Sequence, residues 1–214
     1  MLFRSEAGVY VPSEAYLSGA KALCEKYNAL FIADEVQTGV ARTGKRLAVD
    51  HENVKPDILV LGKALSGGVY PVSAVLADDR IMHVIKAGQH GSTFGGNPLA
   101  AAVAIEALQV VKDEHLAENA ARLGEIFRNE IGDYIKTSKV ATLVRGKGLL
   151  NAVVINDTEE SDTAWNICLK MRDNGLLAKS THGNIIRFAP PLVMNETELR
   201  ECIAIITEAL KHYE

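Results

Sequence analysis

Residues 30–35 read LFIADE and residues 58–63 read ILVLGK, and these two stretches indicate the fold class. Each is a short, continuous apolar run that ends in a charged side chain, which is typical of a strand buried on both faces of a parallel sheet. A helical periodicity over residues 13–27 precedes the first run, and a third apolar run, residues 72–77, follows the second. Helices that alternate with buried strands in this way predict an α/β fold with a mostly parallel sheet.

The sequence changes character in its second half. Asn97 and Pro98 form a start signal for a long helix, because asparagine caps a helix N-terminus and proline fits its first turn. This helix should run to about residue 114, and a second amphipathic helix should follow to about residue 134. The later apolar patterns predict helices over 163–174 and 196–213, and strands over 140–145, 149–155 and 185–188. We therefore expect two domains: residues 1–110, the C-terminal part of a larger α/β domain, and residues 111–214, a smaller α+β domain.

Composition limits the classes of protein that this chain can belong to. Hydrophobic residues make up 48% and charged residues 23% of the 214 residues, a balance typical of a globular protein with a buried core. The net charge is −4 and both signs are mixed along the chain, so no electrostatic feature favours nucleic acid or an anionic membrane as partner. Cys24, Cys168 and Cys202 lie far apart in apolar, helix-like segments, which favours free thiols in a reducing compartment, the cytoplasm or the mitochondrial matrix.

The chain begins MLFRSEAGVYVP, a short apolar piece with no earlier element to pair with. We expect it to be the end of a strand whose domain begins upstream, so any targeting segment would also lie upstream. No stretch reaches the roughly 18 consecutive apolar residues that span a bilayer. The first ten residues also lack the apolar region of a signal peptide.

An acid and an amine directly follow the two apolar runs within residues 30–35 and 58–63. Asp34 and Lys63 are 29 residues apart (63 − 34 = 29), close to the ~30 residues of one βαβ unit, and ligands of open sheets bind beyond the carboxyl ends of the strands. A structural ion pair is the simpler alternative. An enzyme that uses pyridoxal phosphate (PLP) needs both groups: a lysine that binds the cofactor covalently and a carboxylate that keeps the pyridine nitrogen protonated. Val36 would then pack on the ring face, and Gln37 would hydrogen-bond the ring hydroxyl.

Residues 90–98, HGSTFGGNP, combine hydroxyls and glycines ahead of the expected long helix. Ser92, Thr93, backbone N–H groups and the positive end of a helix suit a phosphate, although a flexible glycine-rich connector has the same composition. The segment 146–148, Gly-Lys-Gly, lacks the third glycine and the helix setting of a dinucleotide site. The six histidines show no ligand spacing, so we expect no metal site.

Several long motifs resemble one enzyme family. FIADEVQTGVARTGK (31–45), ILVLGKALSGGVYPVSAVLAD (58–78) and HGSTFGGNPLAAAVA (90–104) are similar, in order and spacing, to the signatures of class III PLP-dependent aminotransferases. VRGKGLLNAVVI (144–155) and GLLAKSTHGNIIRFAPPL (175–192) most resemble the ornithine aminotransferases of that class. The resemblance implies the C-terminal portion of such an enzyme, the type I PLP-transferase fold, PLP as cofactor, and transfer of the δ-amino group of ornithine to 2-oxoglutarate.

The same resemblance implies roles for single residues around the cofactor. Lys63 would bind PLP covalently, Asp34 would contact the pyridine nitrogen and Gln37 the ring hydroxyl. Ser92 and Thr93 would reach the phosphate of the cofactor in a neighbouring subunit, which implies a homodimer with shared active sites.

Glu6 in SEAG and Arg187 in IIRFAPPL would form the family's carboxylate–arginine pair in the substrate pocket. A carboxylate there suits a substrate with a free α-amino group at its far end. Another class III enzyme, acting on acetylornithine or 4-aminobutyrate, is the nearest alternative. The pairing of Glu6 with Arg187 is the feature that distinguishes an ornithine enzyme from these. A nucleotide-hydrolysing domain is a weaker alternative, because LFIADE imitates a Walker B strand but the chain contains no G-x-x-x-x-G-K-[ST] loop. A non-catalytic remnant that folds only with a partner is a third alternative.

Overall fold

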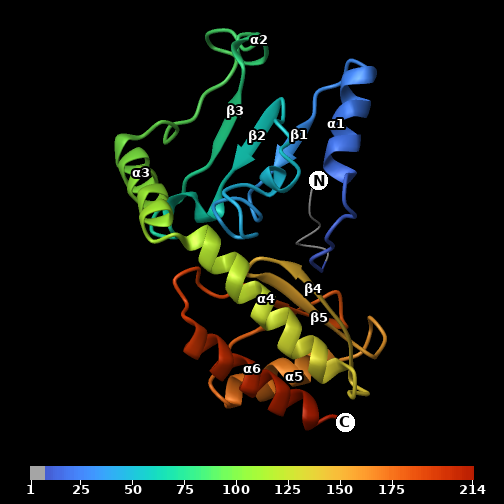
Figure 1. The fold of residues 1–214 in the computed structure, drawn as a ribbon. Helices are drawn as coiled ribbons and strands as arrows, with labels where there is room; N and C mark the ends of the chain where they lie inside the picture. Colours follow the sequence, from blue (N-terminus) through green and yellow to red (C-terminus); the bar gives the residue numbers. More distant parts are fainter. Residues whose placement is uncertain (1–7) are drawn as a thin grey trace. The chain divides into compact units, whose positions relative to one another are not determined.

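The computed structural model describes residues 8–214, which divide into two units (Figure 1). Unit 1 contains residues 12–41 and 45–115, and unit 2 contains residues 8–11, 42–44 and 116–214. The chain leaves unit 1 between His115 and Leu116, five residues beyond the expected boundary and shortly after helix α3 (Pro98–Asp113) ends.

The sheet of unit 1 is mixed. Its three strands, β1 (Ile32–Asp34), β2 (Ile58–Leu61) and β3 (Ala74–Ala77), lie in the order β1-β2-β3. The β1–β2 pair is parallel, as the sequence predicts, whereas β2 and β3 are antiparallel. The expectation of a mostly parallel sheet is thus wrong for the third strand. The connection between β2 and β3 holds only a short 3₁₀ helix, η2 (Lys63–Ser66), whereas a parallel strand needs a crossover that is usually an α-helix.

These strands are also less covered than their apolar sequences predict. Ala33 is fully buried, but Ile32 is 51% exposed, and Val75 and Leu76 on β3 are 56% and 49% exposed. Val75 and Leu76 are consecutive and therefore point to opposite faces, so the expected burial on both faces is wrong for β3 within the described part of the chain.

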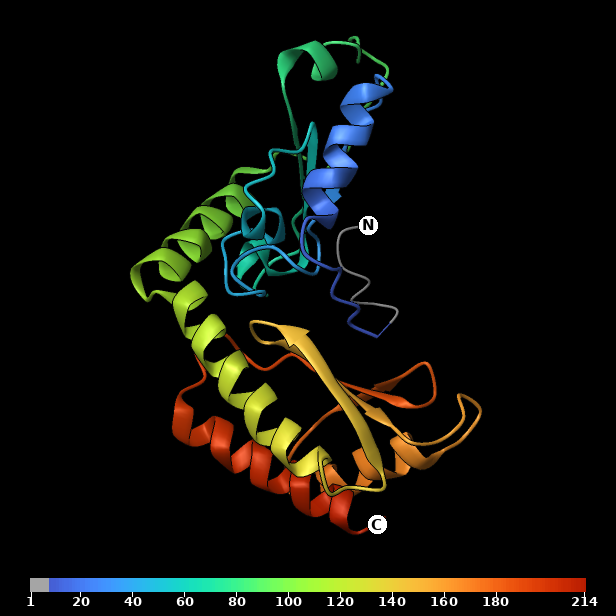
Figure 2. The same cartoon turned by 45° about the vertical axis from the view of Figure 1, so that its right-hand side comes forward.

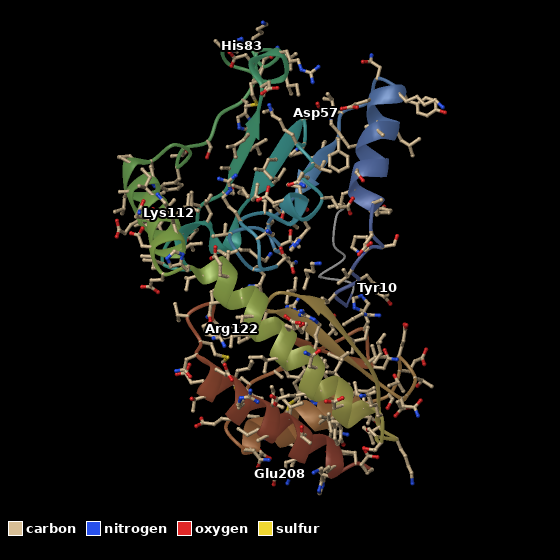
Figure 3. All side chains as sticks on the ribbon, in the orientation of Figure 1. Tyr10, Asp57, His83, Lys112, Arg122 and Glu208 are labelled. Carbon is tan, nitrogen blue, oxygen red and sulfur yellow. The ribbon has the colours of Figure 1, made fainter. Side chains whose placement is uncertain are left out.

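The helices of unit 1 are α1 (Tyr16–Lys26), α2 (Asp79–Met82) and α3 (Pro98–Asp113), with a further 3₁₀ helix, η1 (Ala48–His51). The predicted asparagine cap of α3 is confirmed: Asn97 Oδ1 accepts a hydrogen bond from the backbone N–H of Ala100 at 3.0 Å. Asp57, labelled in Figure 3, connects three parts of unit 1. Its carboxylate accepts from Lys21 Nζ and Phe31 N, both at 2.9 Å, and from Arg80 Nη2 at 3.0 Å.

Unit 2 is an α+β layer structure. Its elements in chain order are α4 (Leu116–Ile135), β4 (Ala141–Lys147), β5 (Leu150–Ile155), α5 (Thr163–Asp173), β6 (Lys179–Thr181), β7 (Ile185–Phe188) and α6 (Glu196–Lys211). The antiparallel sheet has the order β4-β5-β7-β6, and the three helices lie on one of its faces (Figure 2). Side chains such as Phe127, Ile167, Met171 and Ile206 fill the space between the two layers. The sequence predicts every element except β6, a strand of three residues.

Across the described residues, no helix combines the length and the apolar character needed to cross a membrane.

Candidate active site

The parallel β1–β2 pair brings Asp34 and Lys63 to the same edge of the sheet of unit 1. Asp34 is the last residue of β1 and lies opposite Val60, and Lys63 follows Val60 by three residues. One carboxylate oxygen of Asp34 accepts a hydrogen bond from the backbone N–H of Val36 at 3.2 Å. Both charged side chains are exposed, so an incoming ligand can reach them.

Lys63 has an unusual backbone conformation. It is the first residue of η2, and its φ of 48° lies in the left-handed region, which costs a non-glycine residue about 1 kcal/mol or more. Backbone strain of this kind concentrates at functional sites, where the surrounding structure maintains it. The strained position therefore singles out Lys63 among the lysines of unit 1.

The two residues expected beside the cofactor ring lie in the turn after β1. Val36 lies next to the backbone that precedes Lys63, since a Cβ atom added to Gly62 would be 3.5 Å from Val36 Cγ1. Gln37 is half-buried in the same turn. The neighbouring Glu35, which the sequence did not single out, is 1% exposed. Its carboxylate accepts from Thr38 Oγ1 at 2.5 Å and from Val49 N at 2.9 Å, so it fixes the turn while Asp34 faces solvent.

Lys63 and Ser92 line one cavity of about 660 Å³ in unit 1, which we call the Lys63 cavity. Ser73, Phe94, Gly95, Gly96 and Asn97 complete much of its wall, together with residues of the first turn of α3. Ser92 Oγ accepts from the backbone N–H of Gly95 at 3.0 Å, which orders the turn ahead of the helix and leaves the hydroxyl proton available to a ligand. Of the predicted cofactor residues, the structure thus brings Lys63 and Ser92 together in this cavity, while Asp34 and Thr93 are outside its described lining.

Arg187 lies in unit 2, on β7. It is opposite Ala152 of β5 and Lys179 of β6, and Ala152 in turn lies opposite Arg145 of β4. Because directly opposed residues point to the same face, Arg145, Arg187 and Lys179 form a row of cations across one face of the sheet. The like charges of such a row repel one another, and a nearby anion would offset this repulsion. This face of the sheet is therefore suited to binding carboxylates.

Residues 8–10 run along the same face. Val9 is fully buried against Leu150, Ala152 and Ile185, and Arg145 Nε donates to the carbonyl oxygen of Gly8 at 3.0 Å. The Arg145 guanidinium lies 3.8 Å from the centre of the Tyr10 ring. Glu6, the predicted partner of Arg187, lies outside the described residues.

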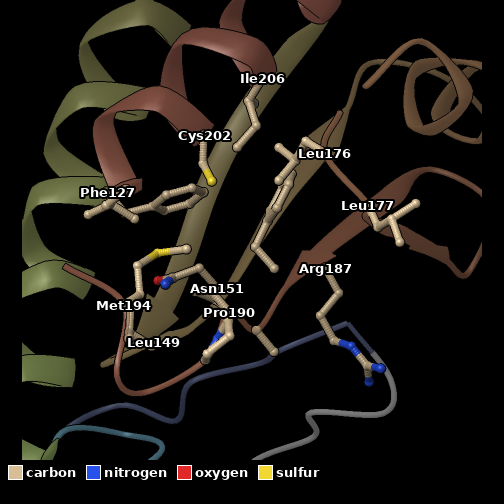
Figure 4. A pocket seen from close by; sticks show the side chains of 14 residues that line it. Phe127, Leu149, Asn151, Leu176, Leu177, Arg187, Pro190, Met194, Cys202 and Ile206 are labelled. Atoms are coloured by element: carbon tan, nitrogen blue, oxygen red, sulfur yellow. The ribbon is translucent and has the colours of Figure 1, made fainter. Parts of the chain in front are cut away.

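Figure 4 shows another cavity, which lies in unit 2, has a volume of about 240 Å³ and has Arg187 at its edge. Its walls are mainly apolar side chains from α4, α6 and the sheet, among them Phe127, Met194 and Ile206. Elsewhere, no group of three or more His, Cys, Asp or Glu side chains that could hold a metal ion occurs within residues 8–214.

A family model described as aminotransferase class-III matches residues 3–210. The chain belongs to the class III aminotransferases. The mitochondrial ornithine aminotransferase of Rattus norvegicus is 61% identical over 207 residues, which cover 97% of this chain and 46% of that protein. The ornithine aminotransferase of Plasmodium falciparum (isolate 3D7) is 51% identical over 99% of this chain and 50% of its own length.

Solved structures of this class have the same fold. An acetylornithine aminotransferase from Elizabethkingia anophelis superposes with a TM-score of 0.96 at 63% identity, covering 98% of this chain and 52% of its own. The ornithine aminotransferase of Plasmodium yoelii gives a TM-score of 0.95 at 52% identity, with 99% and 56% covered. The predicted α/β fold, a partial PLP-transferase fold, is therefore confirmed. The chain spans about half the length of the curated relatives that it matches.

Proposed function

We propose that this chain is part of a PLP-dependent ornithine δ-aminotransferase. The enzyme would move the δ-amino group of ornithine to 2-oxoglutarate and release glutamate semialdehyde and glutamate. The observation that carries the proposal is the identity of 51–61% with proteins named ornithine aminotransferase, which extends over nearly the whole chain. Residues of unit 1 would be the C-terminal part of the large PLP-binding domain, and those of unit 2 the small domain.

The residues at the Lys63 cavity fit PLP. The cavity offers the amine that an aldehyde requires, and its serine hydroxyl and helix start suit a phosphate. We propose that this phosphate belongs to the cofactor of the neighbouring subunit, which the mixing experiment below tests. Gly95 lines the cavity with its backbone, because glycine has no side chain. It is tightly packed against Ser92, since an added Cβ would lie 2.9 Å from Ser92 Cβ. When bound, PLP supplies an electron sink for the reacting carbon of the substrate.

Within this arrangement Lys63 has two tasks. Its Nζ would hold the cofactor, and as a free amine it would take up and move the proton of Cδ of ornithine. Asp34 would hold the proton on the pyridine nitrogen, Val36 would pack on the ring face and Gln37 would hydrogen-bond its hydroxyl. Asp34 suits this role better than Glu35, because the carboxylate of Glu35 is buried and occupied by Thr38 and Val49.

Glu6 and Arg187 would act as a switch between the two substrates. Gly8 and Val9, which follow Glu6 closely, lie on the cationic face of unit 2 that contains Arg187, and this supports a pairing of the two residues. A paired arginine would not attract the α-carboxylate of ornithine, so the δ-amine would reach the cofactor. Separation of the pair would free the guanidinium for a bidentate bond to the carboxylate of 2-oxoglutarate.

The second candidate substrate is N-acetylornithine, which is favoured by the 63% identity with a solved structure named acetylornithine aminotransferase. The two activities are separated by comparing kcat/KM of the complete enzyme for ornithine and for N-acetylornithine. A preference for the acetylated substrate would refute the proposed specificity and leave the PLP chemistry intact.

The cofactor site is tested by chemical labelling. Borohydride reduction of the complete enzyme loaded with PLP, followed by peptide mapping, is expected to leave the pyridoxyl group on Lys63. A label on any other lysine would contradict the assignment. Lys55, an exposed lysine of the same unit, serves as the internal control.

The proposed homodimer is tested by mixing two inactive variants, Lys63→Ala and the double variant Ser92→Ala/Thr93→Ala. If Ser92 and Thr93 serve the neighbouring subunit's cofactor, each mixed dimer contains one fully native site, and activity returns on mixing. If they serve their own subunit, no native site forms and activity stays absent.

A further inference from the structure

We infer that Arg42 is a positioning residue that fixes the end of the strand carrying Arg187, and thereby sets the placement of the Arg187 guanidinium for the oxo-acid substrate. The inference deepens the proposed function and rests on it, because it assigns Arg42 an effect on the step in which Arg187 binds a carboxylate.

The chain after Arg187 cannot be held by the sheet alone. Strand β7 ends at Phe188, the last residue that pairs with β5, and Ala189, Pro190 and Pro191 follow. Proline has no backbone N–H, so Pro190 and Pro191 cannot donate to β5, and only their carbonyl oxygens can take part in hydrogen bonds. A donor from elsewhere is needed to hold their carbonyl groups.

Arg42 supplies that donor. Its Nη1 donates to the carbonyl oxygen of Pro190 at 2.6 Å and to that of Leu149 at 3.0 Å. Leu149 directly precedes β5, so the guanidinium joins the adjacent ends of β5 and β7 where the ladder stops. Leu149 and Pro190 lie together at one edge of the cavity in Figure 4.

The backbone of residues 42–44 is itself held firmly in unit 2. The backbone N–H of Leu149 donates to the carbonyl oxygen of Arg42 at 3.1 Å, so the two residues are bonded in both directions. Gly148 permits this approach, since an added Cβ would lie 2.3 Å from the carbonyl carbon of Thr43. Burial lowers the pKa of Arg42 to about 10, which still leaves it protonated at neutral pH.

A second side chain holds the continuation of the segment. Asn119 Nδ2, on α4, donates to the carbonyl oxygens of Leu192 at 2.8 Å and Met194 at 2.9 Å. Residues 190–194 thus receive hydrogen bonds from two side chains. Arg42 makes the contact nearer to Arg187, three residues away along the chain. Loss of Arg42 would therefore free the end of β7, while the helix side of the segment stays held.

The test uses the complete enzyme and three variants: Arg42→Ala, Arg42→Lys and the control Arg128→Ala. Arg128 is a matched arginine, because burial lowers its pKa too. Its Nη1 donates to the carbonyl oxygen of Gly148 at 3.1 Å and to Asn151 Oδ1 at 2.9 Å, rather than to residues 189–194. Single-turnover rates are measured separately for ornithine and for 2-oxoglutarate. Hydrogen exchange is followed at the amides of Ala189, Leu192 and Val193.

Arg42→Ala is expected to lower kcat/KM for 2-oxoglutarate tenfold or more, mainly through KM, and to change the ornithine half-reaction less than threefold. Exchange at residues 189–193 should become faster. Arg42→Lys should restore part of both properties, and Arg128→Ala should lower thermal stability without changing the ratio of the two half-reactions. If Arg42→Ala does not fold, Arg42→Lys gives the same comparison with a smaller effect.

Equal losses in both half-reactions, the same change of ratio in Arg128→Ala, or unchanged exchange at residues 189–193 would overturn the inference. A native enzyme that does not react with 2-oxoglutarate would refute the proposed function instead. In that case the exchange measurement still decides whether Arg42 holds the end of β7.

Discussion

Replacement of Gly148 by alanine tests a close backbone contact within unit 2. Gly148 lies between β4 and β5 with a φ of 55°, in the left-handed region. A Cβ added there would lie 2.3 Å from the carbonyl carbon of Thr43, 2.5 Å from the nitrogen of Gly44 and 2.7 Å from the carbonyl oxygen of Arg42. All three atoms belong to backbone, so the strain cannot be relieved by rotating a side chain.

Two penalties add at this position. A left-handed conformation costs alanine about 1–2 kcal/mol, and overpacking of a tight interior costs about 1–3 kcal/mol. The free energy of unfolding of unit 2 should therefore fall by about 2–5 kcal/mol. Gly175 provides the matched control, because its φ is also positive, at 93°, but no atom lies within 4 Å of an added Cβ. Gly175→Ala carries only the backbone penalty, about 1–2 kcal/mol.

Urea unfolding of the 214-residue chain can be followed by the fluorescence of Trp165, its single tryptophan, which lies on α5 in unit 2. The midpoint should fall distinctly further for Gly148→Ala than for Gly175→Ala. Equal shifts in the two variants would mean that residues 42–44 do not approach the hairpin as described. The geometric basis for the role of Arg42 would then be lost too.

Three further predictions concern the cofactor, the substrate and a thiol. Asp34→Asn should still bind PLP at Lys63, as judged by borohydride labelling, but lose transamination almost completely, because a neutral amide cannot hold the pyridine nitrogen protonated; near-normal turnover would exclude this role. Glu6→Ala should raise the rate with glutamate relative to ornithine, and Arg187→Ala should mainly damage the half-reaction with 2-oxoglutarate; equal loss in both halves would indicate a structural ion pair. Burial raises the pKa of Cys168 from 9.0 to about 11, so the unfolded state loses this proton first and the free energy of unfolding should fall as pH rises from 9 to 11; Cys168→Ala should remove this part of the pH dependence.

Local signals in the sequence predicted much of the fold. The Asn97-Pro98 helix start, the strand pair around Gly146 and Gly148 and the closing helix all depend on residues close together in the chain, and the structure contains each of them. The antiparallel direction of β3 has no such signal. It depends on what the chain does between Leu61 and Ala74, and the apolar pattern of a strand is the same in either direction.

The candidate site was predictable only where a residue of the required chemical type directly follows an apolar strand. Asp34 and Lys63 follow apolar runs, and their proximity follows from the parallel pairing of β1 and β2. The left-handed φ of Lys63 and the burial of Glu35 are tertiary properties that sequence could not supply. Arg42 was missed for the same reason, because its acceptors, Leu149 and Pro190, lie more than 100 residues away in the chain.

The motif of residues 31–45 serves both units, which gives its positions different functions. Asp34 and Val36 belong to unit 1, beside Lys63, whereas residues 42–44 belong to unit 2 and bond to the strand ends near Arg187. Substitutions at 34–37 should therefore alter how PLP is bound and change its absorption spectrum. Substitutions at 42–44 should leave that spectrum intact and alter the response to the carboxylate of the second substrate. If both sets of variants behave as expected, one continuous signature combines the proposed cofactor function with the proposed substrate function. An absorption spectrum would identify the first set, and the rate with the second substrate would identify the other.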